Sequence, residues 1–197
     1  MLVEQRGGRV RFYNDPAFQA RAAGEVAEAL AIFPVCHPDD RLILHWGMVL
    51  LAYPLFGQVA GAAGRLLRLQ GSFRLAQLNS RIAAQWGHRS TLDTAVPRIV
   101  YSLLDWQALV GTEQPGVYQA GQPISATDPA TLRWLLEASM TANGSDRPLS
   151  DLLRAVELFP FDVAVGASQV TQSPRLQVYQ QGQEMTMVHA LTDGAAR

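Results

Sequence analysis

Apolar residues recur at helical spacing through residues 75–105, and a break at Gly87 divides this stretch in two. In the first part the apolar positions at three- and four-residue steps are Leu75, Leu78, Ile82 and Trp86. In the second part the corresponding positions are Leu92, Val96, Ile99 and Leu103. The pattern predicts two amphipathic helices, of which the first ends at Gly87. Ser90 is the predicted N-cap of the second, with Asp93 as the acidic partner of a capping box.

A hairpin pattern follows the second helix. Residues 106–110 alternate like a strand, residues 111–116 supply Gly and Pro for a turn, and residues 117–120 can return as the partner strand. Pro97 fits the second helix badly, because an interior proline removes a backbone hydrogen bond at a cost of ~3 kcal/mol. We therefore expect this helix to kink at Pro97 or to begin later. The order helix, turn, helix, hairpin is that of a winged helix-turn-helix.

Further elements are predicted on both sides of this segment. They are a short strand at residues 9–13, helices at residues 16–33, 129–143 and 148–159, and a hairpin at residues 173–190. Asp15 and Asp128 each precede a proline and are the expected N-caps of the first two of these helices. Gln181 and Gly182 are the expected turn of the hairpin.

Residues 42–64 form an uncharged run of 23 residues, which is long enough to span a bilayer. Pro54 and four glycines interrupt the run, and arginines flank both of its ends, so nothing favours one membrane orientation. We favour two buried helices, the first capped by Asp39 or Asp40 and the second running from Leu55 to Leu69 after the break at Pro54. A transmembrane segment is the minor alternative.

With 197 residues and 48% hydrophobic content, the chain can bury a sizeable core. We divide it into an N-terminal helical segment (1–53), a winged helix-turn-helix (54–121) and a C-terminal helical pair with a β-hairpin (122–197), packed as one compact unit. The predicted fold class is mainly α, with a winged helix-turn-helix core, flanking helices and a second small C-terminal β-hairpin.

The charge of the chain is unevenly distributed. Its basic residues are sixteen arginines and no lysine, which together with many alanines is typical of a GC-rich genome. Residues 1–63 carry five Arg and six acids, residues 64–98 carry six Arg and one acid, and residues 99–197 carry five Arg and ten acids. The net charges are therefore −1, +5 and −5. The positive charge is concentrated on the predicted helix-turn-helix and the helix before it.

No pattern of catalytic residues or metal ligands stands out. Cys36 is the single cysteine, which excludes an internal disulfide and a multi-cysteine metal site and favours a reducing, cytoplasmic setting. The four histidines match no metal-site spacing: His37, His45, His88 and His189. Cys36 and His37 are sequence neighbours, whereas catalytic pairs normally meet from distant parts of the chain, so we favour a structural role for them. We predict no catalytic residue, metal or cofactor.

The winged helix-turn-helix carries the functional signal. Arginines attract DNA phosphates and can bind guanine bidentately, and the start of a recognition helix is the part that usually reaches base edges. We expect Arg74 and Arg81 to hold the backbone and Gln114 to enter an adjacent groove, although Glu113 beside it repels phosphate. The predicted residues that bind duplex DNA are Arg74, Arg81, His88, Arg89, Ser90, Thr91, Thr94, Arg98 and Gln114.

Residues 71–121 resemble the winged helix-turn-helix superfamily. A narrower resemblance covers residues 42–110, where the uncharged LLAYPLF helix, the segment RLAQLNSRI and a helix that starts with ST and closes on LLDWQALV occur in this order. This order looks like the BrxA family, the small DNA-binding accessory proteins of BREX-type phage-defence systems. The resemblance implies a cytoplasmic, non-enzymatic DNA-binding component that acts with larger protein partners.

A different class of function is left open by the sequence. Winged helices also bind other proteins, and the net charge of −5 over residues 99–197 does not favour nucleic acid. The apolar hairpin at 175–189 could offer an edge strand to a partner. The alternative to DNA binding is therefore a protein-interaction or scaffold subunit.

Overall fold

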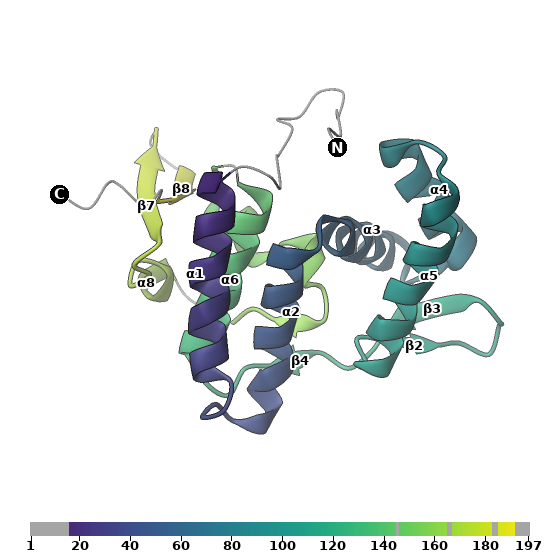
Figure 1. The fold of residues 1–197 in the computed structure, drawn as a ribbon, viewed down its shortest axis with the longest axis horizontal. Helices are drawn as coiled ribbons and strands as arrows, with labels where there is room; N and C mark the ends of the chain where they lie inside the picture. Colours follow the sequence, from purple (N-terminus) through teal and green to yellow (C-terminus); the bar gives the residue numbers. More distant parts are fainter. Residues whose placement is uncertain (1–15, 145, 165–166, 183–184, 192–197) are drawn as a thin grey trace. The chain divides into compact units, whose positions relative to one another are not determined.

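The computed structural model describes residues 16–144, 146–164, 167–182 and 185–191 (Figure 1). Helices contain most of these residues, which confirms the prediction of a mainly α fold. The strand predicted at residues 9–13 and the Asp15 cap lie outside the described residues. The described chain forms two compact units: the first contains Leu55–Ile124 and Val156–Phe161, and the second contains the residues before Leu55, Ser125–Ala155 and the residues from Asp162 onward.

The first unit combines three helices with a small antiparallel sheet. Its elements in chain order are α3 (Pro54–Gln70), β1 (Ser72–Arg74), α4 (Leu75–Trp86), α5 (Ser90–Asp105), β2 (Leu109–Gly111) and β3 (Val117–Ala120). The strand order is β1-β3-β2, with Arg74 opposite Val117 and Gly111 opposite Tyr118. β1 is missing from the prediction because three residues are too few to show a strand periodicity. In Figure 1 the β2–β3 hairpin projects from the end of α5.

The apolar stripe of α5 differs from the predicted one at one position. Val100 is buried, whereas Ile99 is only half-buried. The buried residues are Leu92, Val96, Val100 and Leu103. Two successive four-residue steps followed by a three-residue step keep a stripe on one face of a helix with 3.6 residues per turn. The helix also runs through Pro97 from Ser90 to Asp105, so it does not begin after the proline.

Small residues line the buried part of α3. From Ala60 to Gly64 every residue is buried, and no side chain in this run is larger than a methyl group. Gly64 lies against the backbone of the 3-10 turn η2 (Val156–Leu158), because a Cβ added to it would be 2.0 Å from the carbonyl oxygen of Val156. This approach brings two distant segments of the first unit into contact.

Replacing Gly64 with alanine is expected to destabilise the protein by about 1 to 3 kcal/mol, because backbone must move to accommodate the methyl group. Gly61 on the same helix is a matched control, since the nearest atom to its added Cβ, Nη1 of Arg65, is 3.6 Å away. Gly61→Ala should keep or slightly raise the stability through better helix propensity. Thermal unfolding of both variants measures the difference, and equal melting temperatures would contradict the proposed close contact.

The second unit packs helices on one another and on a second small sheet. Its elements in chain order are α1 (Pro16–Ile32), α2 (Arg41–Ala52), α6 (Pro129–Asn143), β5 (Arg147–Pro148), α7 (Leu149–Leu153), α8 (Ala167–Val170), β7 (Leu176–Gln181) and β8 (Met185–Ala190). The strand order is β5-β8-β7, and β7 and β8 pair where the C-terminal hairpin was predicted. A further two-stranded sheet joins β4 (Ile124–Ser125) and β6 (Phe161–Asp162). One buried hydrophobic cluster of this unit consists of Ala29, Leu44, Leu51, Trp134 and Ala138.

Two acidic residues at helix starts behave differently. Asp128 caps α6 as predicted, since its Oδ1 accepts a hydrogen bond from the backbone N of Ala130 at 2.8 Å. Asp40, one of the two predicted residues, holds the N-cap position of α2, but its side chain makes no cap hydrogen bond to the helix. Its buried carboxylate instead accepts hydrogen bonds from the backbone N of Thr127 at 2.7 Å and of Asp128 at 3.0 Å. Asp40 therefore ties the start of α2 to the start of α6.

The single helix predicted at residues 148–159 is also wrong. The chain forms α7 over Leu149–Leu153 and then the short 3-10 turn over Val156–Leu158. The break falls where the chain leaves the second unit at Ala155 and enters the first at Val156. The apolar residues before the break are buried in the second unit, and those after it are buried in the first unit. The helix therefore ends where the chain passes from one unit to the other.

The uncharged run at residues 42–64 is divided between α2 and α3, as the break at Pro54 predicted. Most of it is buried, including Trp46, Leu50 and Phe56. Among the described helices, none is by itself both long enough and apolar enough to cross a membrane. Residues 38–52 and 54–70 meet that requirement only when they are counted together across the break.

Candidate nucleic-acid interface

All nine residues predicted to contact DNA are exposed in the structure. They come from four places in the first unit: the start and middle of α4, the turn after α4, the first half of α5 and the tip of the β2–β3 hairpin. Within the described chain, no ion pair forms on Arg81, Arg89 or Arg98. Their charge is therefore available to an external anion.

The outer face of α5 is fixed by its buried face. Burial of Leu92, Val96, Val100 and Leu103 against the first unit turns the opposite stripe toward solvent. This outer stripe consists of Ser90, Thr94, Arg98, Tyr101 and Asp105, all of them exposed. We call these five residues the α5 stripe. It contains three of the predicted residues and, in addition, Tyr101, which was not predicted.

The start of α5 differs in detail from the prediction. Arg89, with φ −136° and ψ 130°, holds the N-cap position in an extended conformation, and Ser90 is the first helical residue. No side chain caps the helix, so the capping box of Ser90 and Asp93 is wrong. The prediction fails by one position because the helix begins one residue earlier than expected, with Arg89 instead of Ser90 at the N-cap. The uncapped amides of the first turn and the positive end of the helix dipole favour an anion at this point.

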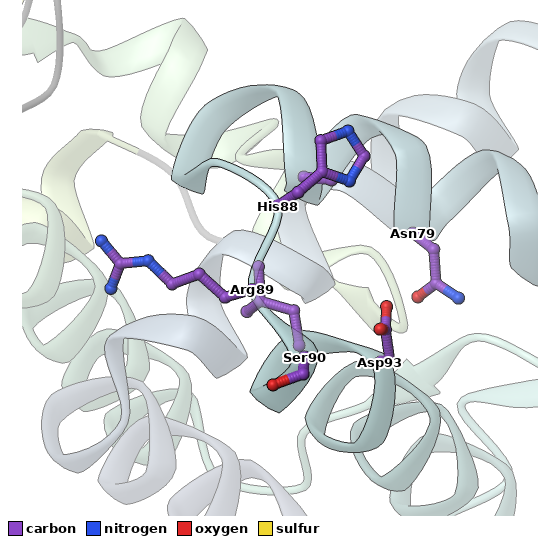
Figure 2. Close-up of a pocket in the computed structure, with 7 residues that line it drawn as sticks. Asn79, His88, Arg89, Ser90 and Asp93 are labelled. Atoms are coloured by element: carbon purple, nitrogen blue, oxygen red, sulfur yellow. The ribbon is translucent and has the colours of Figure 1, made fainter.

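A cavity of about 190 Å³ lies between α4 and the start of α5. Figure 2 shows the side chains of Asn79 and Asp93 facing one another in it, whereas the guanidinium of Arg89 extends away from Asp93. The cavity is lined by Asn79, Ala83, His88, Arg89, Ser90, Leu92 and Asp93. Asp93 in the first turn stabilises the helix dipole but repels phosphate. Because Arg89 points elsewhere, this carboxylate does not neutralise it.

The hairpin tip is connected to the start of α4. Nη2 of Arg74 donates a hydrogen bond to Oε1 of Gln114 at 3.4 Å, and the backbone N of Leu75 donates to the carbonyl of Gly116 at 3.2 Å. Gly116 has φ 74°, which only glycine adopts without strain, and this conformation closes the tip. The structure therefore brings together Arg74 and Gln114, which are forty residues apart in sequence.

The remaining predicted residues are distributed around these features. Thr91 is exposed beside the α5 stripe, and His88 lines the cavity. Arg81 is exposed on α4 but lines neither the cavity nor the contact between Arg74 and Gln114. Tyr101 could have been found from its spacing, because it follows Thr94 by seven residues and Arg98 by three, and both spacings keep one helical face.

The residues considered for other chemistry have local partners. The thiol of Cys36 donates to the carbonyl of Phe33 at 3.3 Å, and Nδ1 of His37 lies 3.4 Å from the carboxylate of Asp39. Within the described ranges, no group of three or more His, Cys, Asp or Glu side chains is placed to hold a metal ion.

Comparison with protein-family models, with curated proteins and with solved structures found no match to this chain.

Proposed function

We propose that residues 54–121 form a winged helix-turn-helix that binds duplex DNA without catalysing a reaction. The observation that carries the proposal is the α5 stripe, an exposed helical face with Arg98 at its centre and the unpaired Arg89 beside its first residue. The α3, α4 and α5 helices, the three-stranded sheet and the projecting hairpin occur in the order that this fold requires.

The dimensions and charge of this surface suit B-form DNA. An α-helix with its side chains is about 10 to 12 Å across, which matches the major groove width of roughly 12 Å. In this arrangement Ser90, Thr94 and Arg98 face base edges or phosphates. Arg74 and Gln114, at the start of α4 and the hairpin tip, lie at a second contact on the backbone or in the adjacent groove. The net charge of +5 over residues 64–98 provides the attraction to phosphate.

Binding is expected to weaken steeply with salt. If Arg74, Arg81, Arg89 and Arg98 each neutralise one phosphate, the slope of log affinity against log salt should be roughly −3 to −4. Affinity should then fall on the order of 100-fold between ~50 and ~200 mM salt. Fluorescence anisotropy of a labelled duplex measures this directly. Absence of binding at ~50 mM salt, or an affinity that salt leaves unchanged, would contradict the proposal.

The resemblance to the BrxA family adds a biological setting to the proposal. In that setting the protein is a cytoplasmic component of phage defence and acts with larger protein partners. Variants with reduced DNA binding should then reduce the protection of host cells against phage, which plaque counts measure. Full protection by a variant that no longer binds DNA would separate the defence role from DNA binding.

A second candidate is a protein-interaction subunit. The observation in its favour is β7, an edge strand of the β5-β8-β7 sheet whose six residues, Leu176–Gln181, include no charged side chain. Edge strands without charges readily accept a strand from another chain. Co-purification with a stable protein partner, together with no shift of any duplex at low salt, would favour this candidate over DNA binding.

A further inference from the structure

Tyr101 is the most exposed aromatic side chain in the first unit, with 59% of its surface accessible. It lies in the C-terminal half of the outward face of α5, three residues after Arg98 and seven after Thr94. Among the described residues its hydroxyl has no hydrogen-bond partner, and its ring contacts no other aromatic side chain. Among the described residues, neither a hydrogen bond nor an aromatic contact therefore holds the ring at this position.

If α5 lies in the major groove, the ring of Tyr101 is carried toward the base edges with Arg98. A ring that covers a polar base edge removes water from that edge without offering it a hydrogen bond, which costs free energy. The ring is therefore expected to contact an apolar group of the base instead. On the major-groove edge of the base pairs, the apolar group is the 5-methyl of thymine. The other edge groups there are hydrogen-bond donors and acceptors.

We propose that Tyr101 contacts the 5-methyl group of thymine, and that this contact gives the surface a preference for A·T-containing duplexes. The inference rests on the proposed function and deepens it, because it names the class of DNA site that α5 reads. Arg98 on the same stripe contributes positive charge, which attracts the phosphates of any sequence. Tyr101 contributes the discrimination between thymine and bases that lack the methyl group.

The test compares duplexes that differ by this methyl group. One is an alternating adenine–thymine duplex, and the other has deoxyuridine in place of every thymine, which removes the methyl and keeps the base pairing. The parent protein should bind the thymine duplex more tightly, by about fourfold for each methyl contact. A guanine–cytosine duplex with 5-methylcytosine should likewise bind more tightly than its unmethylated form, because the added methyl occupies the same edge of the groove.

Variants assign the effect to the ring. Tyr101→Ala should bind the thymine and deoxyuridine duplexes equally, whereas Tyr101→Phe, which keeps the ring, should retain the difference. Because Tyr101 is exposed, neither change should unfold the protein, and circular dichroism with a thermal scan checks this. The matched control is Tyr53→Ala, which removes another exposed tyrosine, 66% accessible and outside the first unit, and should behave like the parent.

The outcomes separate this inference from the function on which it rests. Tight, salt-dependent binding with equal affinity for the thymine and deoxyuridine duplexes would overturn the role of Tyr101 and leave DNA binding intact. Discrimination that persists in Tyr101→Ala would also overturn it, and would assign the methyl contact to another residue such as Thr94. Absence of any duplex binding by the parent at low salt would overturn both.

Discussion

Replacing Arg89 and Arg98 together with alanine is expected to weaken binding to duplex DNA by roughly 2 to 5 kcal/mol. Each good contact to a base or phosphate contributes ~1 to 3 kcal/mol. Both arginines are exposed and neither forms an ion pair within the described chain, so their replacement removes no ion pair from the folded protein. The loss should therefore appear in DNA binding and not in stability.

The same experiment reports on the type of contact. If both arginines bind phosphate, the slope of log affinity against log salt should fall by about 2. If Arg98 binds guanine, the loss should be larger for some sequences than for others. A gel-shift or anisotropy titration of parent and variant at two salt concentrations distinguishes these cases.

Arg154→Ala is the matched control. Arg154 is also an exposed arginine, but it lies at the end of α7 in the second unit, so its removal should change affinity little. Equal affinity of the double variant and the parent protein would move the DNA-binding surface away from α5. Thermal unfolding of all three proteins shows whether a variant that binds DNA more weakly is still folded.

A second large effect is expected in the second unit, where Glu25→Gln should remove a pH dependence of stability. Glu25 on α1 is almost fully buried, with 1% of its surface accessible. Its Oε1 accepts a hydrogen bond from the hydroxyl of Thr141 at 2.6 Å, and its Oε2 has no partner among the described residues. Burial raises the pKa of Glu25 from 4.5 to about 7, although the Thr141 hydrogen bond and the positive charge of Arg175 oppose the shift.

The charged groups around Glu25 come from three segments. They are Arg21 and Glu28 on α1, Glu137 on α6, and Arg175 just before β7. Arg175 is already shared, since its Nη1 lies 2.5 Å from the carboxylate of Glu28 and 3.0 Å from that of Glu137. Burial therefore outweighs the attraction of Arg21 and of the shared Arg175, and its raised pKa lets Glu25 hold its proton up to about pH 7.

The direction of the pH effect follows from the raised pKa. Below pH 4.5 both the folded and the unfolded chain hold the proton, so Glu25 contributes no pH dependence. Between pH 4.5 and about 7 the unfolded chain releases the proton while the folded chain keeps it, so the free energy of unfolding falls as the pH rises. The full loss above pH 7 is roughly 3 kcal/mol, at 1.36 kcal/mol for each pKa unit.

Glutamine is neutral at every pH and keeps an oxygen that can accept the Thr141 hydrogen bond. Glu25→Gln should therefore be more stable than the parent at pH 8 by up to about 3 kcal/mol and similar to it near pH 4.5. Chemical or thermal unfolding across this pH range measures the difference. Asp151→Asn, at an exposed acid in α7, is the control and should follow the parent profile. A parental stability that does not fall between pH 5 and 7 would show that Glu25 is not the buried acid described.

Much of the first unit could be predicted from local pattern. The α4 and α5 helices lie where the apolar spacing places them, with Gly87 between them, and the strands of the hairpin flank the Gly- and Pro-containing turn. These features depend on residues that are close in sequence, so hydrophobic periodicity and the residues that favour turns are sufficient to predict them. The exposure of the five predicted contact residues that lie within α4 and α5, Arg81, Ser90, Thr91, Thr94 and Arg98, follows from the same amphipathic pattern.

Other features depended on residues that are distant in sequence. The three-residue strand β1 forms because β3 lies beside it, and the pairing of Arg74 with Gln114 follows from that register. The helix predicted at 148–159 breaks because its two halves enter different units. The predicted N-cap at Ser90 and the predicted buried position at Ile99 were each wrong by one residue. Only packing against α4 and the sheet fixes where α5 begins and which of its faces is buried.

The sequence by itself determined the mainly α character, the positions of α4 and α5 and the concentration of arginine in residues 64–98, because propensity, periodicity and charge are local properties. Only the tertiary structure decided which groups are buried and which meet. Glu25 looks like any helical surface acid until α1 packs on α6, and Ile99 looks like core until Val100 takes the buried position beside it. Burial and contact are set by three-dimensional packing, and the pKa of Glu25 and the outward face of α5 depend on that packing.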